Sequence, residues 1–342
     1  MKLLIERNIP FVKGVLEPYF DVEYLATGEF TCERVGEADA LMVRTRTHCN
    51  AELLEGSRVS FIGTATIGTD HIDLEYCREK GIYVANAPGC NAPGVAQYVL
   101  SSIGQWMRMK APQTKPEELT LGIVGVGHVG SIISKWARNI GFKVLENDPP
   151  RALRDKEFAR RAVSLGQIAR ECDIITFHTP LTKEGADRTW HLCDAELLGS
   201  LKKCKLLINS ARGGIVDNSA VASLIEEGKH IPELVIDCWE GEPDINPVLL
   251  DRAFIATPHI AGYSKQGKQR ATRMTVAQIA RYFRLPMEIQ PVDMGDRTKP
   301  TLEQVMESYN PLEDTGRLKT SPESFEEQRN HYSLRNEPLQ ST

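Results

Sequence analysis

The feature that most constrains the fold of this chain is a glycine-rich turn between an apolar run and an amphipathic segment. Residues 121–130 read LGIVGVGHVG, so the apolar run ends in the pattern G-x-G-x-x-G at Gly125, Gly127 and Gly130. Residues 131–140 then carry apolar side chains at helical spacing. A strand, a tight turn and a helix in this order point the N–H groups of the helix N-terminus at a pyrophosphate. The three glycines are predicted to allow, in turn, the tight turn, the approach of the phosphates and the close packing of helix on strand.

A glycine pattern of this kind also arises for packing alone, so the residues that follow it matter. A second predicted strand, residues 143–147, leads directly into Asp148. An acidic residue about 20 positions after the glycine turn binds the adenosine ribose in Rossmann domains. The sequence therefore predicts a dinucleotide site, and Asp148 favours NAD because its charge would repel the 2′-phosphate of NADP. Arg151 is a counter-signal, since an arginine near this position accommodates that phosphate.

Composition and charge bear on the class of partner. The chain has 342 residues, enough for two domains, with the 41% hydrophobic and 25% charged content of an ordinary globular protein. A net charge of −5 without a basic block predicts no nucleic-acid partner and no membrane partner. The eight cysteines are scattered without a C-x-x-C pair, which predicts free thiols and no metal site. No signal peptide or apolar run of about 18 residues is evident, so we expect a cytoplasmic protein.

Short apolar runs alternate with amphipathic stretches on both sides of the glycine turn, as in parallel α/β sheets. Polar loops follow these runs, and ligands of such sheets bind outside the carboxyl ends of the strands. The loops of the first part are therefore expected to form one side of a cleft. The predicted strands before the turn are 3–5, 22–25, 40–43, 60–63 and 82–85, and those after Asp148 are 173–177, 205–209, 233–236 and 254–256. Predicted helices include 11–20, 92–109, 219–227 and 267–283, with short ones at 302–309 and 322–332.

Three polar residues follow apolar strands in the second half: Arg212, Glu242 and His259. An arginine can bind a carboxylate through two hydrogen bonds and stays charged at any working pH. A histidine can accept a hydroxyl proton as hydride leaves the same carbon, and a carboxylate on its other nitrogen fixes the tautomer. Together they supply what oxidation of a 2-hydroxyacid needs. Taken singly, each has a structural alternative: a turn, a surface bend and a buried structural histidine.

Five motifs in order make the chain resemble the D-isomer specific 2-hydroxyacid dehydrogenases. They are the glycine turn, HTPL at 178–181, NSARGGIVD at 209–217, Asp237 followed by Glu242-Pro243, and TPHIAG at 257–262. Finer stretches narrow the resemblance to members that act on a small phosphorylated hydroxyacid. These are VRT at 43–45, GTATIGTDH at 63–71, APGCN at 87–91, DPPR at 148–151, WEGEP at 239–243 and HIAGY at 259–263.

The resemblance implies site residues and NAD as the cofactor. Arg212, Glu242 and His259 become the catalytic residues, with His259 as the acid/base. The implied cofactor-binding residues are Gly125, Gly127, His128, Val129, Gly130, Asp148, Thr179, Ser210, Ala211, Arg212, Asp237 and Gly262. Thr45, Thr66 and Tyr263 would contact the substrate. We add Arg44 and Arg46 as candidates for the substrate phosphate, because that group needs positive charge; ordinary surface charge is the alternative.

The resemblance also implies a domain plan. A Rossmann-type doubly wound parallel sheet is inserted into a second, flavodoxin-like α/β substrate domain, with a C-terminal dimerisation segment. The expected bounds are 1–96 for the first part of the substrate-binding (lid) domain, 97–264 for the NAD-binding domain, 265–285 for a return helix and 286–342 for the C-terminal segment. That segment is shorter than is usual in the family, but residues 325–332 resemble its end, so a homodimer is expected.

Two alternatives remain open at this point. The chain could be another D-2-hydroxyacid dehydrogenase, acting on glycerate or hydroxypyruvate. It could also be a nucleotide-binding regulator of the same fold that has lost catalysis, although the intact Arg212, Glu242 and His259 speak against this.

Overall fold

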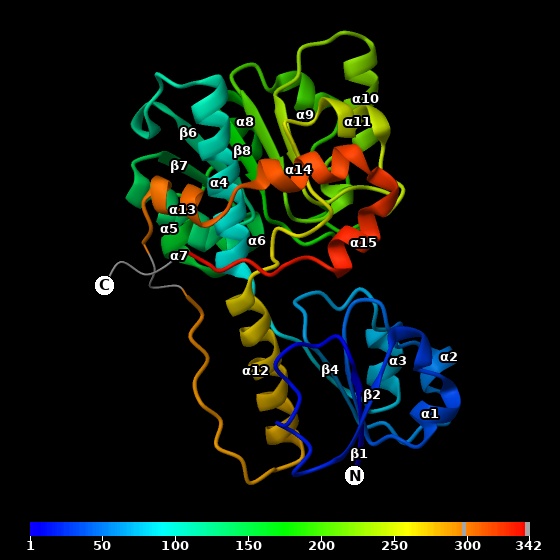
Figure 1. The fold of residues 1–342 in the computed structure, drawn as a ribbon. Helices are drawn as coiled ribbons and strands as arrows, with labels where there is room; N and C mark the ends of the chain where they lie inside the picture. Colours follow the sequence, from blue (N-terminus) through cyan, green and yellow to red (C-terminus); the bar gives the residue numbers. More distant parts are fainter. Residues whose placement is uncertain (296–298, 339–342) are drawn as a thin grey trace. The chain divides into compact units, whose positions relative to one another are not determined.

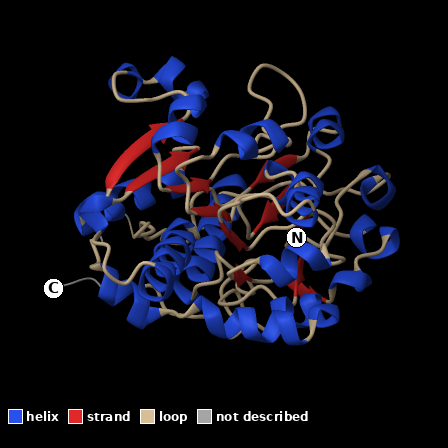
Figure 2. Ribbon diagram, turned by 90° about the horizontal axis from the view of Figure 1, so that it is seen from above, coloured by secondary structure: helices blue, strands red, loops and turns tan. Residues whose placement is uncertain are grey.

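The computed structural model describes residues 1–295 and 299–338, and the chain divides into two compact units. Unit 1 comprises Met1–Asn91 and Ser264–Gly295, and unit 2 comprises Ala92–Tyr263 and Asp296–Thr342. Residues 296–298 and 339–342, which belong to the predicted C-terminal segment, lie outside the described residues. Each unit contains one parallel sheet flanked by helices (Figures 1 and 2).

Unit 1 has a five-stranded sheet in the order β2-β1-β3-β4-β5, in which every pairing of neighbours is parallel. This is the strand order of flavodoxin-like domains, as predicted. The strands are β1 (Lys2–Glu6), β2 (Asp21–Leu25), β3 (Ala40–Val43), β4 (Phe61–Thr64) and β5 (Tyr83–Ala85). Its helices are η1 (Thr27–Glu29), α1 (Cys32–Gly36), α2 (Ala51–Leu54), α3 (Leu74–Glu79) and α12 (Lys265–Tyr282).

The sheet of unit 1 has an apolar cluster on each side. One cluster joins β1 and β3 side chains to Ala271, Val276 and Ile279 of α12, and the other packs the opposite side chains against α1, α2 and α3. Each of these four helices begins at a Ser, Thr, Asn or Asp whose side chain accepts a backbone N–H of the first turn. Both faces of β3 and β4 are buried, and the loops that follow these strands lie at the carboxyl edge of the sheet.

The helix predicted for residues 11–20 is wrong: the segment is a series of turns. Its apolar spacing is helical, and Val12, Leu16 and Phe20 are indeed buried. However, Phe11 and Gly14 have positive φ angles of 62° and 84°. Residues with positive φ interrupt a right-handed helix, because every residue of such a helix has a negative φ. Apolar side chains at helical spacing are thus buried here by consecutive turns and not by a helix.

Unit 2 has a six-stranded sheet in the order β11-β10-β9-β8-β6-β7, again with parallel pairing between neighbours. The strands are β6 (Thr120–Val124), β7 (Lys143–Asn147), β8 (Ile174–Phe177), β9 (Leu206–Asn209), β10 (Glu233–Ile236) and β11 (Ile255–Ala256). Chain order reverses at β6, which lies between β7 and β8. In doubly wound sheets such a switch point places the ligand at the carboxyl ends of the strands.

The helices of unit 2 cover both faces of this sheet. They are α4 (Ala92–Lys110), α5 (His128–Ile140), α6 (Pro149–Arg154), α7 (Lys156–Ala159), α8 (Leu165–Glu171), α9 (Ala195–Ser200), α10 (Asn218–Glu226), α11 (Pro247–Arg252), α13 (Leu302–Ser308), α14 (Pro311–Thr320) and α15 (Phe325–Asn330), with short 3₁₀ turns η2 (Pro116–Glu118), η3 (Gly213–Ile215) and η4 (Pro322–Ser324). Strand residues such as Ile123, Ile174 and Ile208 are fully buried, as expected where both faces are covered. Within the described residues, no helix combines the length and apolar character needed to span a bilayer.

The C-terminal segment packs onto unit 2. Val305 of α13, Leu318 of α14 and Phe325 of α15 are all fully buried in the two cores of that unit. The short helices predicted at 302–309 and 322–332 correspond to α13 and α15, whereas α14 was not predicted. Leu318 of α14 belongs to the same core as Phe325, so tertiary packing accounts for its burial.

Arg335 fastens the end of this segment to unit 2. Its guanidinium is buried and donates hydrogen bonds to Gln97 Oε1 at 3.0 Å, Ile260 O at 3.0 Å and Gly94 O at 3.1 Å. It also donates to the carbonyls of Ala261 and Tyr263 and lies over the Tyr309 ring at 4.3 Å. One side chain thus ties the C-terminal segment to α4 and to the loop after β11.

Candidate active site

The glycine turn of unit 2 is closed by backbone on one side and open on the other. Gly125 has a φ of 89°, and a Cβ there would lie 2.7 Å from Thr179 N. A Cβ on Gly130 would collide with the Gly125 carbonyl oxygen, whereas one on exposed Gly127 would meet nothing within 4 Å. Helix α5 starts at His128, and no side chain caps it. Its first N–H groups therefore face an open space of the kind that binds pyrophosphate.

Asp148 lies at the end of β7, beside this turn. Its Oδ2 accepts Val126 N–H at 2.8 Å and its Oδ1 accepts Arg151 N–H at 2.9 Å, which caps α6. The Arg151 guanidinium donates to Val126 O at 2.7 Å and Ser131 Oγ at 3.1 Å, pairs with Asp155 and lies 4.5 Å from the Phe158 ring. Arg151 is therefore hydrogen-bonded to the glycine turn, and its charge is paired with that of Asp155. These contacts weaken Arg151 as a sign that the site accepts NADP.

Two hydroxyls predicted to line the cofactor site are buried without a hydrogen-bond partner among the described residues. They are Thr179 Oγ1, after β8, and Ser210 Oγ, after β9. A buried polar group without a partner costs about 1–3 kcal/mol, and native structures contain few of them. The open glycine turn and these two hydroxyls thus fit a dinucleotide that supplies the missing hydrogen bonds.

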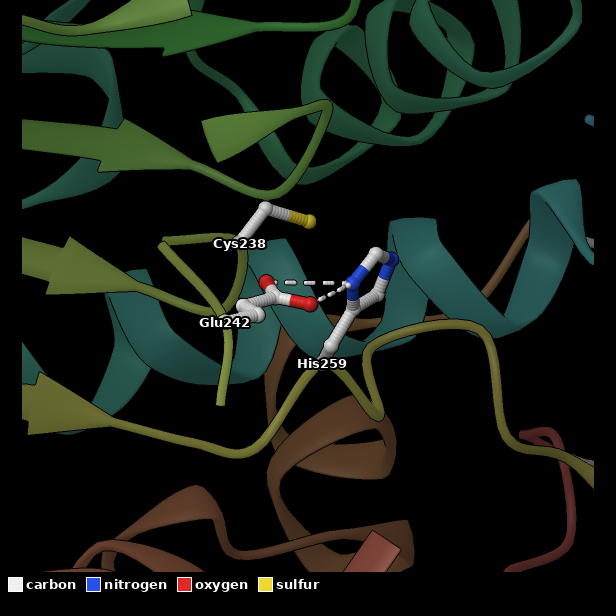
Figure 3. A group of neighbouring side chains, drawn as sticks. All are labelled: Cys238, Glu242 and His259. Atoms are coloured by element: carbon white, nitrogen blue, oxygen red, sulfur yellow. Dashed lines mark hydrogen bonds and ion pairs between the residues drawn. The ribbon is translucent and has the colours of Figure 1, made fainter. Parts of the chain in front are cut away.

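His259 and Glu242 form the central pair of the site (Figure 3). His259 Nδ1 lies 2.9 Å from Glu242 Oε2 and 3.2 Å from Oε1. Both side chains are partly buried, at 29% and 18% exposure. His259 has a φ of 55°, an uncommon conformation for a non-glycine residue that directs its ring toward the carboxylate. The contact between Nδ1 and the Glu242 carboxylate thereby fixes the orientation of the imidazole ring.

The carboxyl of Glu242 is kept ionised by its neighbours. Burial acts to raise its pKa, but the charge and hydrogen bond of His259, the Trp239 N–H and the charge of Arg329 outweigh it. The net result is a pKa below the ordinary value of a glutamate. Because Trp239 N–H donates to Glu242 Oε1 at 2.8 Å, the carboxylate also has a fixed orientation.

The two loops that carry this pair are held by other carboxylates. Asp237 is 1% exposed and accepts Thr257 Oγ1 and Ile260 N–H, both at 2.7 Å, and Ala261 N–H at 3.0 Å. Burial raises the pKa of the Asp237 carboxyl, although these donors and His259 act against it. The predicted cofactor residue Asp237 thus lies beneath the loop that carries His259.

Glu240, two residues before Glu242, holds the loop that carries Glu242. Its Oε1 lies 2.7 Å from His191 Nε2, and its Oε2 accepts Asn218 N–H at 2.9 Å. His191 Nδ1 also lies 3.3 Å from Asp217 Oδ2. The loop that presents Glu242 is therefore braced against the segment that follows β9.

Arg212, the third predicted catalytic residue, follows β9 and reaches the same group of side chains. It is partly buried, and its charge acts on the thiol of Cys238. Cys238 Sγ lies with the side-chain ligand atoms of Glu242 and His259 within 4.8 Å of one another (Figure 3). Burial raises the pKa of the Cys238 thiol well above its ordinary value, which favours the neutral thiol beside the pair.

The residues predicted to contact substrate from unit 1 lie at the carboxyl ends of β3 and β4. The buried carboxylate of Glu6 accepts Arg44 N–H at 2.8 Å and Thr47 Oγ1 at 3.0 Å, which fixes the loop between them. Thr45 and Arg46 are exposed on this loop. On the neighbouring loop, Thr66 Oγ1 lies 2.7 Å from Thr64 Oγ1 and donates to Gly68 O at 3.0 Å.

Sequence reasoning missed two arginines of the C-terminal segment. Arg335 binds the carbonyls of the loop that carries His259 and Tyr263, and Arg329 of α15 lies 4.0 Å from Glu242 Oε2. Both lie about 200 residues after the glycine turn, in a charge-dense stretch whose composition is typical of a solvent-exposed segment. The only sequence feature that drew attention to this region was the resemblance of residues 325–332 to the end of the family's C-terminal region.

Comparison with known proteins relates the chain to a family of dehydrogenases. Residues 95–261 match the family model described as D-isomer specific 2-hydroxyacid dehydrogenase, NAD binding domain. A D-lactate dehydrogenase from Aquifex aeolicus, solved with NAD and lactic acid, is similar with a TM-score of 0.67 and 26% identity, over 83% of this chain and 96% of that one. The fold is that of the NAD-dependent 2-hydroxyacid dehydrogenases.

Two relatives align along nearly the whole chain, and both are named erythronate-4-phosphate dehydrogenase. The protein from Bacteroides thetaiotaomicron is 49% identical over 98% of this chain and 97% of its own length. The protein from Porphyromonas gingivalis is 40% identical over 97% of this chain and 92% of its own length. The chain belongs to the erythronate-4-phosphate dehydrogenase family.

Proposed function

We propose that the protein oxidises 4-phospho-D-erythronate to (R)-3-hydroxy-2-oxo-4-phosphobutanoate in the biosynthesis of pyridoxal 5′-phosphate. The observation that carries the proposal is the 2.9 Å contact between His259 Nδ1 and Glu242 Oε2 beside the carboxyl ends of a Rossmann sheet. The relatives that align over nearly full length carry the name of this activity. We also propose that the protein works in the cytoplasm as a homodimer, as the family resemblance implies.

The proposed roles follow from the atoms that the site leaves available. NAD, when bound, supplies the hydride acceptor for C2 of the substrate. His259 Nδ1 is engaged with Glu242, so Nε2 is the atom that accepts the proton of the C2 hydroxyl. The Glu242 carboxylate then stabilises the imidazolium that forms. Arg212 binds the substrate carboxylate and stabilises negative charge on the C2 oxygen.

The remaining predicted residues keep the roles that the resemblance implies. His128 and Val129 offer their N–H groups to the pyrophosphate at the start of α5, and Asp148 binds the adenosine ribose. Thr179, Ser210, Ala211 and Gly262 line the nicotinamide half, supported by Asp237. Thr45, Thr66 and Tyr263 contact the substrate, and the exposed Arg46 with Arg44 binds its phosphate.

The test of the proposed substrate compares 4-phospho-D-erythronate with unphosphorylated erythronate, with NADH formation followed by absorbance. We expect kcat/KM to be about 100-fold lower for erythronate, since each charge-assisted hydrogen bond to the phosphate contributes about 1.5–3 kcal/mol. Arg46→Gln should reduce this difference, whereas Arg58→Gln, which alters another exposed arginine of unit 1, should not. Equal rates for the two acids would contradict a phosphate-specific enzyme, and turnover of glycerate alone would favour the alternative dehydrogenase.

NAD is expected to be preferred over NADP by a factor of about ten or more in kcat/KM, because the Asp148 carboxylate repels a 2′-phosphate. Asp148→Asn should narrow the preference: it removes the charge but keeps a residue that caps α6. Steady-state kinetics with both cofactors check this expectation. Faster turnover with NADP in the unaltered protein would show the assignment to be wrong.

A further inference from the structure

Arg329 is an arginine in unit 2 that no predicted role uses. It lies in α15, which is anchored by fully buried Phe325 and by hydrogen bonds from Gln328 Nε2 to Ser324 Oγ at 2.7 Å and Ser321 O at 3.1 Å. Its side chain is only 17% exposed. A buried guanidinium is costly unless it is paired, so its surroundings should show what it is paired with.

Two partners of Arg329, Glu242 and Tyr263, belong to the proposed active site, and a third, Glu326, lies on α15 itself. Arg329 Nη1 lies 4.0 Å from Glu242 Oε2 and 3.7 Å from Glu326 Oε1, and its side chain is hydrogen-bonded with that of Tyr263. Its Nε is buried and has no partner among the described residues. A purely structural arginine would be expected to satisfy its donors, as Arg335 does through six acceptors. Arg329 instead leaves its Nε without a partner among the described residues and contacts two site residues, Glu242 and Tyr263, in addition to Glu326.

We propose that Arg329 is a positioning residue of the active site, which holds the Glu242 carboxylate ionised toward His259 and orients the Tyr263 side chain toward the substrate. The inference rests on the proposed function and extends it: the C-terminal segment completes the catalytic site in addition to packing on unit 2. Arg329 acts through Glu242 and Tyr263, and touches neither the proton in transfer nor the C2 atom.

The electrostatics of Glu242 give the expected sign of the pH effect. The charged and titratable groups that face its carboxyl are His259 from the loop after β11, Arg329 from α15 and Cys238 after β10, while Glu326 faces the other side of Arg329. Arg329 is one of the groups that lower the pKa of Glu242 against the effect of burial. Without this cation Glu242 takes up its proton at a higher pH. As the pH falls, activity should therefore be lost earlier in the variant than in the unaltered protein.

The experiment measures kcat, KM and their pH dependence for Arg329→Gln, Arg329→Lys and Arg317→Gln. Arg317 is the matched control, since it lies on α14 of the same segment with 66% of its side chain exposed. For Arg329→Gln we expect kcat to fall on the order of tenfold, as for a lost hydrogen bond to a charged group, and the acidic limb of the pH profile to move up. KM for NAD should stay unchanged. Arg329→Lys should keep the acidic limb in place, and Arg317→Gln should behave like the unaltered protein.

Two results would overturn the proposal: an Arg329→Gln profile that coincides with that of the unaltered protein, or equal rate losses in Arg329→Lys and Arg329→Gln with no movement of the acidic limb. If Arg329→Gln does not fold, the same results are expected from Arg329→Met, which keeps the apolar part of the side chain. If the unaltered protein does not oxidise 4-phospho-D-erythronate but oxidises another D-2-hydroxyacid, the proposed substrate fails. The variants are then compared on that acid, because the pairing of His259 with Glu242 serves either substrate.

Discussion

Replacing His259 by asparagine is expected to lower kcat on the order of 10³-fold while cofactor binding is kept. The imidazole is the group placed to take the hydroxyl proton, with its Nδ1 held 2.9 Å from Glu242 Oε2. Asparagine is the appropriate replacement because His259 has a φ of 55°, and asparagine tolerates this left-handed conformation better than alanine does. Oxidation of 4-phospho-D-erythronate and NADH binding, followed by its fluorescence, are measured in parallel.

His230→Asn is the control for this change, since His230 is an exposed histidine of unit 2. It should leave both measurements as they are in the unaltered protein. Undiminished turnover in His259→Asn would remove the histidine from catalysis and revive the interpretation of the chain as a nucleotide-binding regulator. A joint loss of turnover and NADH binding would indicate that the loop after β11 has lost its structure.

Replacing Arg335 by leucine is expected to reduce the free energy of unfolding by about 3 kcal/mol or more. The substitution removes a buried guanidinium that donates hydrogen bonds to the carbonyls of Gly94, Ile260, Ala261 and Tyr263. These acceptors would then be buried without a donor, and each such group costs about 1–3 kcal/mol. In a unit of this size a loss of that extent lowers the unfolding midpoint by about 10 °C.

Differential scanning calorimetry of the protein without cofactor tests this expectation, because a bound ligand would mask part of the change. Arg317→Leu is the matched control: that arginine is exposed on α14 and pairs with Asp314. We expect a shift within about 1 °C for the control, as for most surface substitutions. An unchanged midpoint in Arg335→Leu would show that water or neighbouring side chains satisfy these carbonyls.

The predictable part of the site is the part that is encoded locally. Gly125 makes the turn by its left-handed φ and Gly130 by its small size, and the neighbouring apolar runs form β6 and the buried face of α5. Arg212 and His259 come shortly after short strands, β9 and β11, so chain order alone assigns them to the carboxyl edge of a parallel sheet. The same local approach failed for residues 11–20, where apolar spacing is helical but Phe11 and Gly14 have left-handed conformations.

The fold class, the NAD-binding turn and the identity of the polar groups at the strand ends were thus determined by the sequence itself. Such features depend on residues within about one turn or strand of one another. The tertiary structure alone decided that His259 Nδ1 meets Glu242, that Asp237 holds the loop beneath them, and that Arg329 and Arg335 arrive from the C-terminal segment. These contacts join positions 17 to 241 residues apart. No local periodicity encodes them, because they form only when the packed core brings distant strand ends and helices together.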